Sequence, residues 1–314
     1  EILANSTFAE NRVSRQIFIA THSKEFVEGA ISSGANVNII RLGENNAGRY
    51  SQIYNTSDFR TINNSDFLKI NQSLNGLFFK GIVLCEGKED VLFYQYIFKL
   101  YYKKYKINLS QELYFIDCGS KSGVISYAKI LKKLKIPFSC IFDIDILRHD
   151  QPEIKSLREI YIDDSIYPTD QEIYNLSNQL VIQTYEEVSS DKVKFAESIS
   201  ILENIKSKLE KSEAPSLTEM KDFNESIKNK MKWTLIKRNG LGNLTGDGIP
   251  HALKILETFS KLGIFIVPVG ELESWDKESG SKNNDNWIEK ALMKIDENIF
   301  YNNTELNEFV KKVL

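Results

Sequence analysis

Acidic residues follow two apolar segments of the sequence, at spacings that could gather their carboxylates. Glu86 comes directly after the apolar run 81–85, and Asp90 lies one helical turn further along the chain. Asp143 and Asp145 follow a second apolar run, and side chains at positions i and i+2 of a strand point to the same face. Oxygen ligands of this kind suit Mg²⁺ or Mn²⁺. Two such ions could clamp the attacking and leaving oxygens of a phosphodiester bond.

Two further acids, Glu271 and Glu273, follow a third apolar run. Carboxylates that converge repel one another unless cations neutralise them. Each acid alone also has an ordinary structural explanation, because Asp is common in turns, and Glu89 and Asp90 at a helix start favour the helix dipole. The combination favours a metal site, and the Asp-x-Asp pair that closes a fully apolar strand favours it most.

Basic residues that could contact phosphates lie later in the chain. Five of them fall within the eleven residues 228–238, with no acid among them: Lys228, Lys230, Lys232, Lys237 and Arg238. A solvated helix face explains this run equally well. In the functional interpretation, Lys237 precedes the flexible Gly240-Leu241-Gly242 and offsets negative charge in a transition state. The turn Gly119-Ser120-Lys121-Ser122-Gly123 could also approach a phosphate, although it lacks the full P-loop spacing.

Strand and helix patterns alternate around these residues. Short apolar runs predict strands, and amphipathic stretches between them predict helices. The expected strands are 81–85, 113–117, 138–143 and 263–269, and the expected helices are 88–105, 124–135 and 249–262. Strand–helix–strand repeats with short connections predict an α/β fold with a doubly wound parallel sheet. Residues 150–232 interrupt this rhythm with a polar, helical pattern that predicts an inserted helical domain.

The first part of the chain has a different pattern. Residues 16–20 predict a short buried strand, followed by Thr21-His22-Ser23 and a helix over 24–32, with Thr21 or Ser23 as its N-cap. Residues 36–42 and 50–54 predict a hairpin. His22 at the strand end could sense a nucleotide γ-phosphate. Because the chain starts at Glu1 without a Met, we expect it to be the C-terminal piece of a longer protein.

The composition limits the class of protein. The formal net charge of −3 excludes a strongly basic nucleic-acid binder, but not a protein that reaches phosphates through metal ions and local basic residues. Cys85, Cys118 and Cys140 lie in or beside apolar runs without a Cys-x-x-Cys pair, which indicates free thiols and a cytoplasmic location. No apolar run reaches the roughly 20 residues of a membrane span, so we expect no membrane partner.

The spacing of the acids resembles that of a known family. Glu86-Gly87-x-x-Asp90, followed about fifty-seven residues later by Asp143-x-Asp145, resembles the Toprim domain of topoisomerases, primases and a group of nucleases. Residues 16–23 resemble the strand and switch-histidine end of an ABC-type ATPase domain. That order is similar to the OLD family (overcoming lysogenization defect) of ATPase–Toprim nucleases, to which Gabija-type phage-defence nucleases belong. The segment 270–275 also resembles the last Toprim strand of that family.

The resemblance implies a Toprim-type doubly wound parallel sheet with a helical insertion, preceded by the tail of an ABC-type ATPase domain. The implied segments are an ATPase tail (1–58), a linker (59–76), a first Toprim part (77–149), the insertion (150–232), a second Toprim part (233–276) and C-terminal helices (277–314). The nucleotide-binding loop and signature motif of the ATPase are absent from these residues. ATP would therefore act only through the missing remainder of that domain, with His22 as the one nucleotide-contacting residue here.

The resemblance also implies roles for individual residues. Two ions, Mg²⁺ or Mn²⁺, would be bound by Glu86, Asp90, Asp143 and Asp145, and a later acid would complete the second site. Glu172 and Glu273 rank above Asp170 and Glu271 for that position. Lys237 matches the catalytic lysine of the family, acting with the metal-bound Glu86 and Asp143.

The expected function is a metal-dependent DNA endonuclease that an ATPase domain regulates and that serves phage defence. Its expected partners are DNA, further copies of the chain in a homo-oligomer and an accessory defence protein. The alternative is a catalytically degenerate Toprim module that serves DNA binding or oligomerisation. A primase or topoisomerase fragment is the least favoured interpretation, because neither a zinc module nor a separate catalytic-tyrosine domain is visible.

Overall fold

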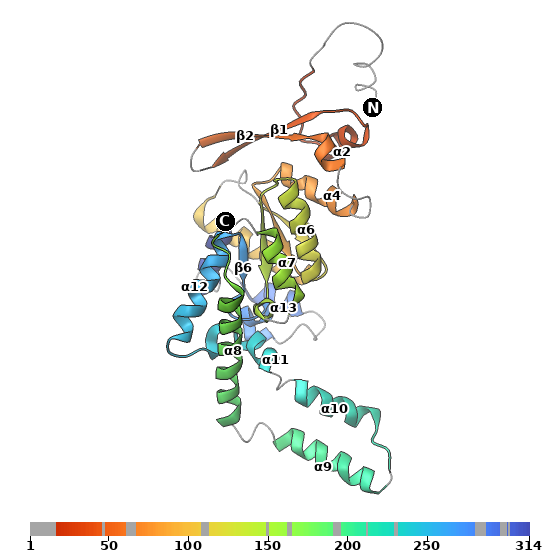
Figure 1. The fold of residues 1–314 in the computed structure, drawn as a ribbon, viewed down its shortest axis with the longest axis vertical. Coiled ribbons are helices and arrows are strands. Elements are labelled where there is room, and N and C mark those ends of the chain that lie inside the picture. Colours follow the sequence, from red (N-terminus) through yellow and green to blue (C-terminus); the bar gives the residue numbers. More distant parts are fainter. Residues whose placement is uncertain are drawn as a thin grey trace. The chain divides into compact units, whose positions relative to one another are not determined.

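The structure is a computed structural model of the 314-residue chain. It describes residues 17–45, 48–60, 67–107, 113–148, 151–161, 165–190, 196–211, 213–228, 232–279, 287–295, 300 and 302–314. The chain divides into two compact units, Glu1–Cys140 and Ile141–Leu314, whose elements are labelled in Figure 1. The domain boundaries expected from the sequence stay predictions.

Strands and helices alternate in the second half of the first unit. β3 (Gly81–Cys85) is completely buried and leads into α5 (Lys88–Tyr105), β4 (Leu113–Asp117), α6 (Lys121–Lys133) and β5 (Phe138–Phe142). The predicted strands 81–85 and 113–117 and the predicted helix 88–105 are confirmed to the residue. α6 begins at Lys121 rather than at the predicted residue 124, because the Ser120 hydroxyl caps it by accepting the Gly123 N–H.

These strands belong to a four-stranded sheet in the order β4-β3-β5-β6. β3 runs parallel to β4 and to β5, and in the second pairing Leu84 lies opposite Cys140. The carboxyl ends of β3 and β5 therefore lie at the same edge of the sheet. The predicted α/β fold with a parallel sheet is confirmed, and the ATPase tail stays a prediction.

The beginning of the described chain departs from one expectation. Residues 17–20 are not in a strand, and Phe18 is 83% exposed, so the predicted buried strand is wrong for these residues. An apolar run becomes a buried strand only where a second strand pairs with it, and none of the described residues does so. Residues 1–16 of the predicted tail lie outside the described residues. The predicted helix is confirmed as α2 (Lys24–Ser32), with Ser23 as its N-cap.

A hairpin follows α2, as predicted. β1 (Asn38–Asn45) and β2 (Gly48–Asn55) pair antiparallel, and both strands extend further toward the turn than the sequence pattern predicted. The connection to β3 contains α3 (Thr56–Arg60), α4 (Phe67–Ser73) and the 3₁₀ helix η2 (Leu74–Leu77).

The second unit begins with a helical region, as predicted. After the 3₁₀ helix η4 (Ile144–Leu147) come the helices α7 (Pro152–Ile160), α8 (Asp170–Ser190), α9 (Ala196–Glu210) and α10 (Leu217–Lys228). Within the described part of 150–228 no residue is in a strand. α9 and α10 lie side by side (Figure 1).

The α/β pattern resumes after this region. The elements in order are α11 (Lys232–Asn239), η6 (Gly240–Asn243), α12 (Gly248–Lys261), β6 (Ile264–Ile266), η7 (Leu272–Ser279), α13 (Trp287–Lys294) and α15 (Thr304–Val313). β6 is shorter than the predicted strand 263–269, because the chain turns at Pro268. The Val267 N–H still donates to the Phe142 carbonyl at 2.9 Å and extends the pairing with β5 by one bond. Among the described helices, none is both long enough and apolar enough to cross a membrane.

Candidate active site

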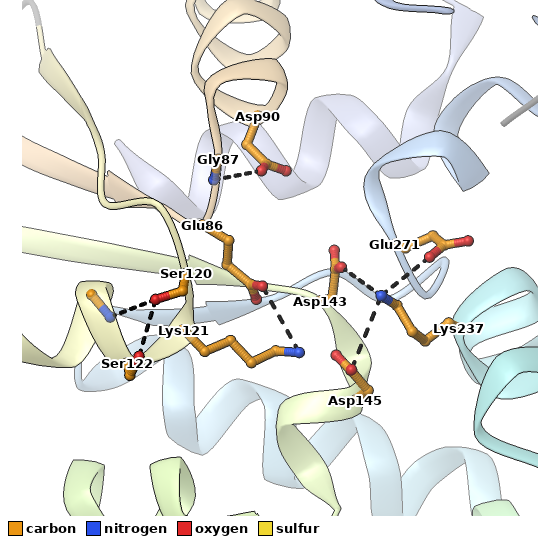
Figure 2. Close-up of polar contacts among 11 residues, drawn as sticks. Glu86, Gly87, Asp90, Ser120, Lys121, Ser122, Asp143, Asp145, Lys237 and Glu271 are labelled. Carbon is orange, nitrogen blue, oxygen red and sulfur yellow. Dashed lines mark hydrogen bonds and ion pairs between the residues drawn. The ribbon is translucent and has the colours of Figure 1, made fainter. Parts of the chain in front are cut away.

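Two of the predicted metal ligands lie at the junction of β3 and α5. Glu86 directly follows the buried strand, and Gly87 stands at the N-cap position of the helix. The Gly87 N–H donates to Asp90 Oδ2 at 2.9 Å, which fixes the Asp90 side chain against the helix start (Figure 2). Asp90 is 7% exposed. It therefore caps the helix as well as standing one turn from Glu86.

The turn before α6 brings a lysine to Glu86. Lys121 Nζ lies 3.8 Å from Glu86 Oε2, and both side chains are largely buried (Figure 2). Two backbone contacts hold this turn at the end of β3. The Cys118 N–H donates to the Cys85 carbonyl at 3.0 Å, and a Cβ on Gly123 would lie 1.9 Å from the Cys118 carbonyl oxygen. Gly123 therefore allows α6 to start close enough for Lys121 to reach the carboxylate.

Three carboxylates surround the ammonium group of Lys237, which lies near the end of α11. Lys237 Nζ lies 3.1 Å from Asp143 Oδ2 and 3.3 Å from Glu271 Oε2. A third carboxylate oxygen, Asp145 Oδ2, lies 4.0 Å from the same nitrogen. Figure 2 shows the ammonium group between the three acids, which come from the segments after β5 and β6. We call these four residues the Lys237 cluster.

Close backbone contacts hold the segments that carry the Lys237 cluster. Gly270 has φ +115°, and a Cβ at this position would lie 1.8 Å from the Lys237 carbonyl oxygen. The Ile144 N–H donates to the Gly270 carbonyl at 2.7 Å, and the Leu241 N–H donates to the Pro268 carbonyl at 2.8 Å. The segments that follow β5 and β6 therefore meet the end of α11 at Gly270, which brings Asp143, Asp145 and Glu271 beside Lys237.

The charges of the cluster are not balanced by its single lysine. Burial alone would lower the pKa of the Lys237 ammonium, but the neighbouring carboxylates, Asp143 above all, outweigh that effect and raise it. Burial raises the pKa of the Glu271 carboxyl, Lys237 opposes this shift, and the negative charge of Glu273 adds to it. Lys237 therefore remains cationic beside the three carboxylates.

The comparisons with known proteins place one segment of the chain in a family. Residues 77–145 match the family described as the Toprim domain of proteins similar to the overcoming lysogenization defect protein. This segment contains Glu86, Asp90, Asp143 and Asp145. The chain carries an OLD-like Toprim domain. The OLD-family Toprim resemblance recognised in the sequence is thereby confirmed, whereas the relation to Gabija-type nucleases stays a prediction.

An OLD-like Toprim domain indicates a metal-dependent, nuclease-type function, and Toprim domains generally bind Mg²⁺. Searches of curated proteins and of solved structures find no match to the chain. Lys237 and Glu271 lie outside the matched segment, so their connection with the Toprim acids is given by the Lys237 cluster alone.

The two Toprim acids that follow β5 do not lie in a strand, contrary to the prediction. Asp143 and Asp145 were expected to share a strand face, but β5 ends at Phe142 and residues 144–147 form the 3₁₀ helix η4. The tighter turn still brings both carboxylates to Lys237, because Asp143 stands directly before that helix and Asp145 lies in its first turn.

The late acids of the prediction separate in the structure. Glu172 Oε2 accepts the Thr169 N–H and the Thr169 hydroxyl, each at 2.9 Å, and so caps the start of α8. Glu273 lies in η7 and is 9% exposed. Glu271, which the sequence analysis ranked below both, is the late acid in contact with Lys237. Its place directly after Gly270 at the strand end was the available signal.

The remaining residues considered for the site are His22, Lys230 and Lys121. His22 is exposed and stands one residue before the N-cap of α2. Its predicted contact with a nucleotide stays a prediction. Lys230 of the basic run lies outside the described residues, and Lys121, which the sequence analysis noted only as part of a weak phosphate-binding turn, is the cation beside Glu86.

The donor chemistry of these acids fits a hard divalent ion. Within the described residues, His, Cys, Asp and Glu side chains nowhere form a ready-made metal cluster of three or more. The acids around Lys237 offer oxygen ligands only, which is the ligand type of Mg²⁺ and Mn²⁺. A positive charge, the Lys237 ammonium, already lies between them, so the cluster accommodates a cation.

Proposed function

We propose that this chain is a DNA endonuclease that hydrolyses phosphodiester bonds with divalent ions bound to its Toprim acids. The observation that carries the proposal is the Lys237 cluster, in which a half-buried lysine contacts the Asp-x-Asp pair of an OLD-like Toprim domain. A lysine held beside carboxylates that bind metal can stabilise the negative charge that develops on a phosphate during hydrolysis.

The proposed ligands are Glu86, Asp90, Asp143 and Asp145, with Glu271 or Glu273 as the later acid. The parallel pairing of β3 with β5 supports this choice of ligands, because an acid follows each of the two strands. When bound, Mg²⁺ or Mn²⁺ would act as a Lewis acid toward the phosphate and lower the pKa of a bound water. Binding of two such ions is part of the proposal.

The residues of the chain have separate tasks in this proposal. The carboxylates bind the ions, and the Asp90 contact with the Gly87 N–H keeps that side chain oriented. Lys237 neutralises charge on a non-bridging oxygen of the phosphate as the attacking oxygen approaches phosphorus. Its three carboxylate neighbours keep the ammonium protonated beside the acids that would bind the ions.

Further parts of the proposal follow from the family resemblance. An ATPase domain outside these residues would regulate cleavage, with His22 contacting its nucleotide. A role in phage defence, a homo-oligomer and an accessory defence protein belong to the same proposal.

A second function fits one observation. The Glu172 carboxylate caps α8, and Asp90 caps α5, so two of the six acids predicted to bind metal have structural roles. A degenerate Toprim module that binds DNA or assembles without cleaving it would keep such roles. It predicts that DNA is retained on the protein without turnover under every divalent ion.

Nicking of supercoiled plasmid DNA tests the two functions. The purified chain should convert the plasmid to open circles with Mg²⁺ or Mn²⁺, and EDTA should stop the reaction. Glu86→Gln should lower the rate at least about 10²-fold, because loss of even an outer-shell partner of a metal ligand costs about 10- to 100-fold. The measurement is the initial rate of open-circle formation on agarose gels.

The matched control for this experiment is Glu89→Gln. Glu89 lies in the same first turn of α5 and is exposed, so this variant should cleave at the wild-type rate. Equal rates for Glu86→Gln and wild type would mean that a contaminating nuclease does the work, and the endonuclease proposal would then be abandoned. DNA binding without nicking under Mg²⁺ and Mn²⁺ would favour the degenerate module.

A further inference from the structure

The Lys237 ammonium contacts the same carboxylate oxygens that a metal ion would use. Its nitrogen lies 3.1 Å from Asp143 Oδ2 and 3.3 Å from Glu271 Oε2. Two carboxylates share one divalent ion only when their oxygens face a common point about 2.1 Å from each. In this structure the Lys237 nitrogen lies between those oxygens (Figure 2). The lysine and an ion shared by Asp143 and Glu271 therefore require the same space.

The backbone of the Lys237 cluster leaves only the side chain free to change. The Lys237 carbonyl oxygen is held against Gly270 and accepts the Ser274 hydroxyl at 3.3 Å. The Ser274 hydroxyl also donates to the Arg238 carbonyl at 3.0 Å. The Lys237 side chain, in contrast, is 29% exposed and can rotate toward solvent about its own torsions. An incoming ion can thus move the ammonium without moving α11.

We propose that the Lys237 ammonium is a built-in counterion of the Asp143–Glu271 pair, and that a divalent ion must displace it to bind there. The inference deepens the proposed function, on which it rests, by giving Lys237 a role before catalysis and by assigning Glu271 as the late acid. In the metal-free protein the lysine offsets the repulsion of the three carboxylates. In the metal-bound protein the displaced ammonium is available to a phosphate oxygen.

Because the lysine and the ion compete for the same oxygens, a substitution that removes the ammonium should raise the affinity for the ion. Removing the ammonium removes the competitor, so Lys237→Met should bind Mn²⁺ about tenfold more tightly than wild type. A lysine that merely orients the carboxylates for the ion would give the opposite result. The affinity is measured by isothermal titration of Mn²⁺ and by the loss of the free-Mn²⁺ signal in electron paramagnetic resonance.

Three further variants sharpen the titration. Lys237→Gln should also bind Mn²⁺ more tightly and serves if the Met variant folds poorly, whereas Lys237→Arg should bind no more tightly than wild type. Lys261→Met is the matched control, because Lys261 forms an ion pair with Glu257 at 3.2 Å on the exposed face of α12, and this variant should leave the Mn²⁺ affinity unchanged.

Thermal unfolding provides a second measurement that does not depend on cleavage. Without metal, Lys237→Met should unfold at a lower temperature than wild type, because three carboxylates lose their counterion. Saturating Mn²⁺ should raise its unfolding temperature by more than that of wild type. Unchanged or weaker Mn²⁺ binding by Lys237→Met, or an equal thermal shift in both proteins, would overturn the inference.

The outcomes also separate this inference from the proposed function. A wild-type protein that binds Mn²⁺ and nicks DNA, together with a Lys237→Met variant of weaker Mn²⁺ affinity, would refute the counterion role alone. Absence of Mn²⁺ binding in both proteins would refute the inference and the endonuclease proposal together. Binding by Lys237→Met but not by wild type would support the counterion role in its strongest form.

Discussion

Lys237→Met should lower the rate of plasmid nicking about 10²- to 10³-fold, even at saturating Mn²⁺. Loss of one preorganised group that stabilises transition-state charge has an effect of this size in other enzymes. Lys237 is well suited to such a role, because its cationic nitrogen lies within 3.3 Å of Asp143 and Glu271 without metal and stays near these acids when an ion displaces it. The measurement is the single-turnover rate with enzyme in excess over plasmid, so that product release does not contribute.

The comparison with Lys237→Arg and Lys261→Met identifies the cause of the loss. The Arg variant keeps a positive charge but changes its position, so it should recover part of the rate. Lys261→Met should cleave at the wild-type rate, because its ion pair lies on the surface of α12. Nicking by Lys237→Met at the wild-type rate would remove the lysine from the chemistry, whatever its effect on metal affinity.

Tight metal binding combined with slow cleavage would be an informative pair of results for Lys237→Met. A residue that only maintained the fold would weaken both properties when replaced. A residue that first neutralises the carboxylates and then the phosphate should change them in opposite directions. The two measurements on one variant therefore distinguish a structural lysine from the catalytic one expected in the sequence.

The elements around Glu86 could be predicted because their signals are local. Five apolar residues, a Glu-Gly pair and an amphipathic stretch specify β3, its turn and α5 without any distant contact. The Ser120 cap of α6 was equally local, although the sequence analysis placed the helix start three residues late. Agreement was best where capping, burial pattern and helix period all indicated the same structure.

The strand predicted at 16–20 is not formed by the described residues 17–20, because a strand depends on a distant partner and not on local signals alone. Ile17, Phe18 and Ile19 have the composition of a buried strand, but their exposure of 48–83% shows that composition alone does not supply a pairing partner. β-structure depends on neighbours that are distant in sequence, which a local pattern cannot reveal.

The acid that contacts Lys237 could not be chosen from the sequence, because long-range packing decides that contact. Glu172 and Glu271 are both acids near an element boundary, and only the preceding Gly270 distinguishes Glu271 locally. The structure separates them through the approach of α11 to the segment after β6, which places Lys237 beside Glu271, whereas Glu172 caps α8. A close backbone contact between residues more than thirty positions apart, here Lys237 and Gly270, leaves only a glycine as its sequence signal.

Gly270→Ala should destabilise the second unit by about 3 kcal/mol or more. The backbone here has φ +115°, where side chains other than glycine's are strained, and the new Cβ would lie 1.8 Å from the Lys237 carbonyl oxygen and 2.9 Å from the Gly240 nitrogen. Both of these atoms belong to the backbone, so the Gly270 segment would have to move away from the segment 237–240. The measurement is the urea dependence of the far-ultraviolet circular dichroism and of tryptophan fluorescence.

Gly246→Ala is the matched control, because it tests backbone strain without the steric contact. Gly246 lies in the same unit with φ +54°, and a Cβ there would meet nothing within 4 Å, so its cost should be about 1 kcal/mol. The difference between the two variants isolates the Gly270–Lys237 contact. Since that contact also holds the Lys237 backbone, Gly270→Ala should lose nicking activity under conditions where it is still folded, and Gly246→Ala should not. Equal stability losses would mean that the segments after β6 and α11 can separate freely, and the rigid placement of Lys237 among its carboxylates would then have no support.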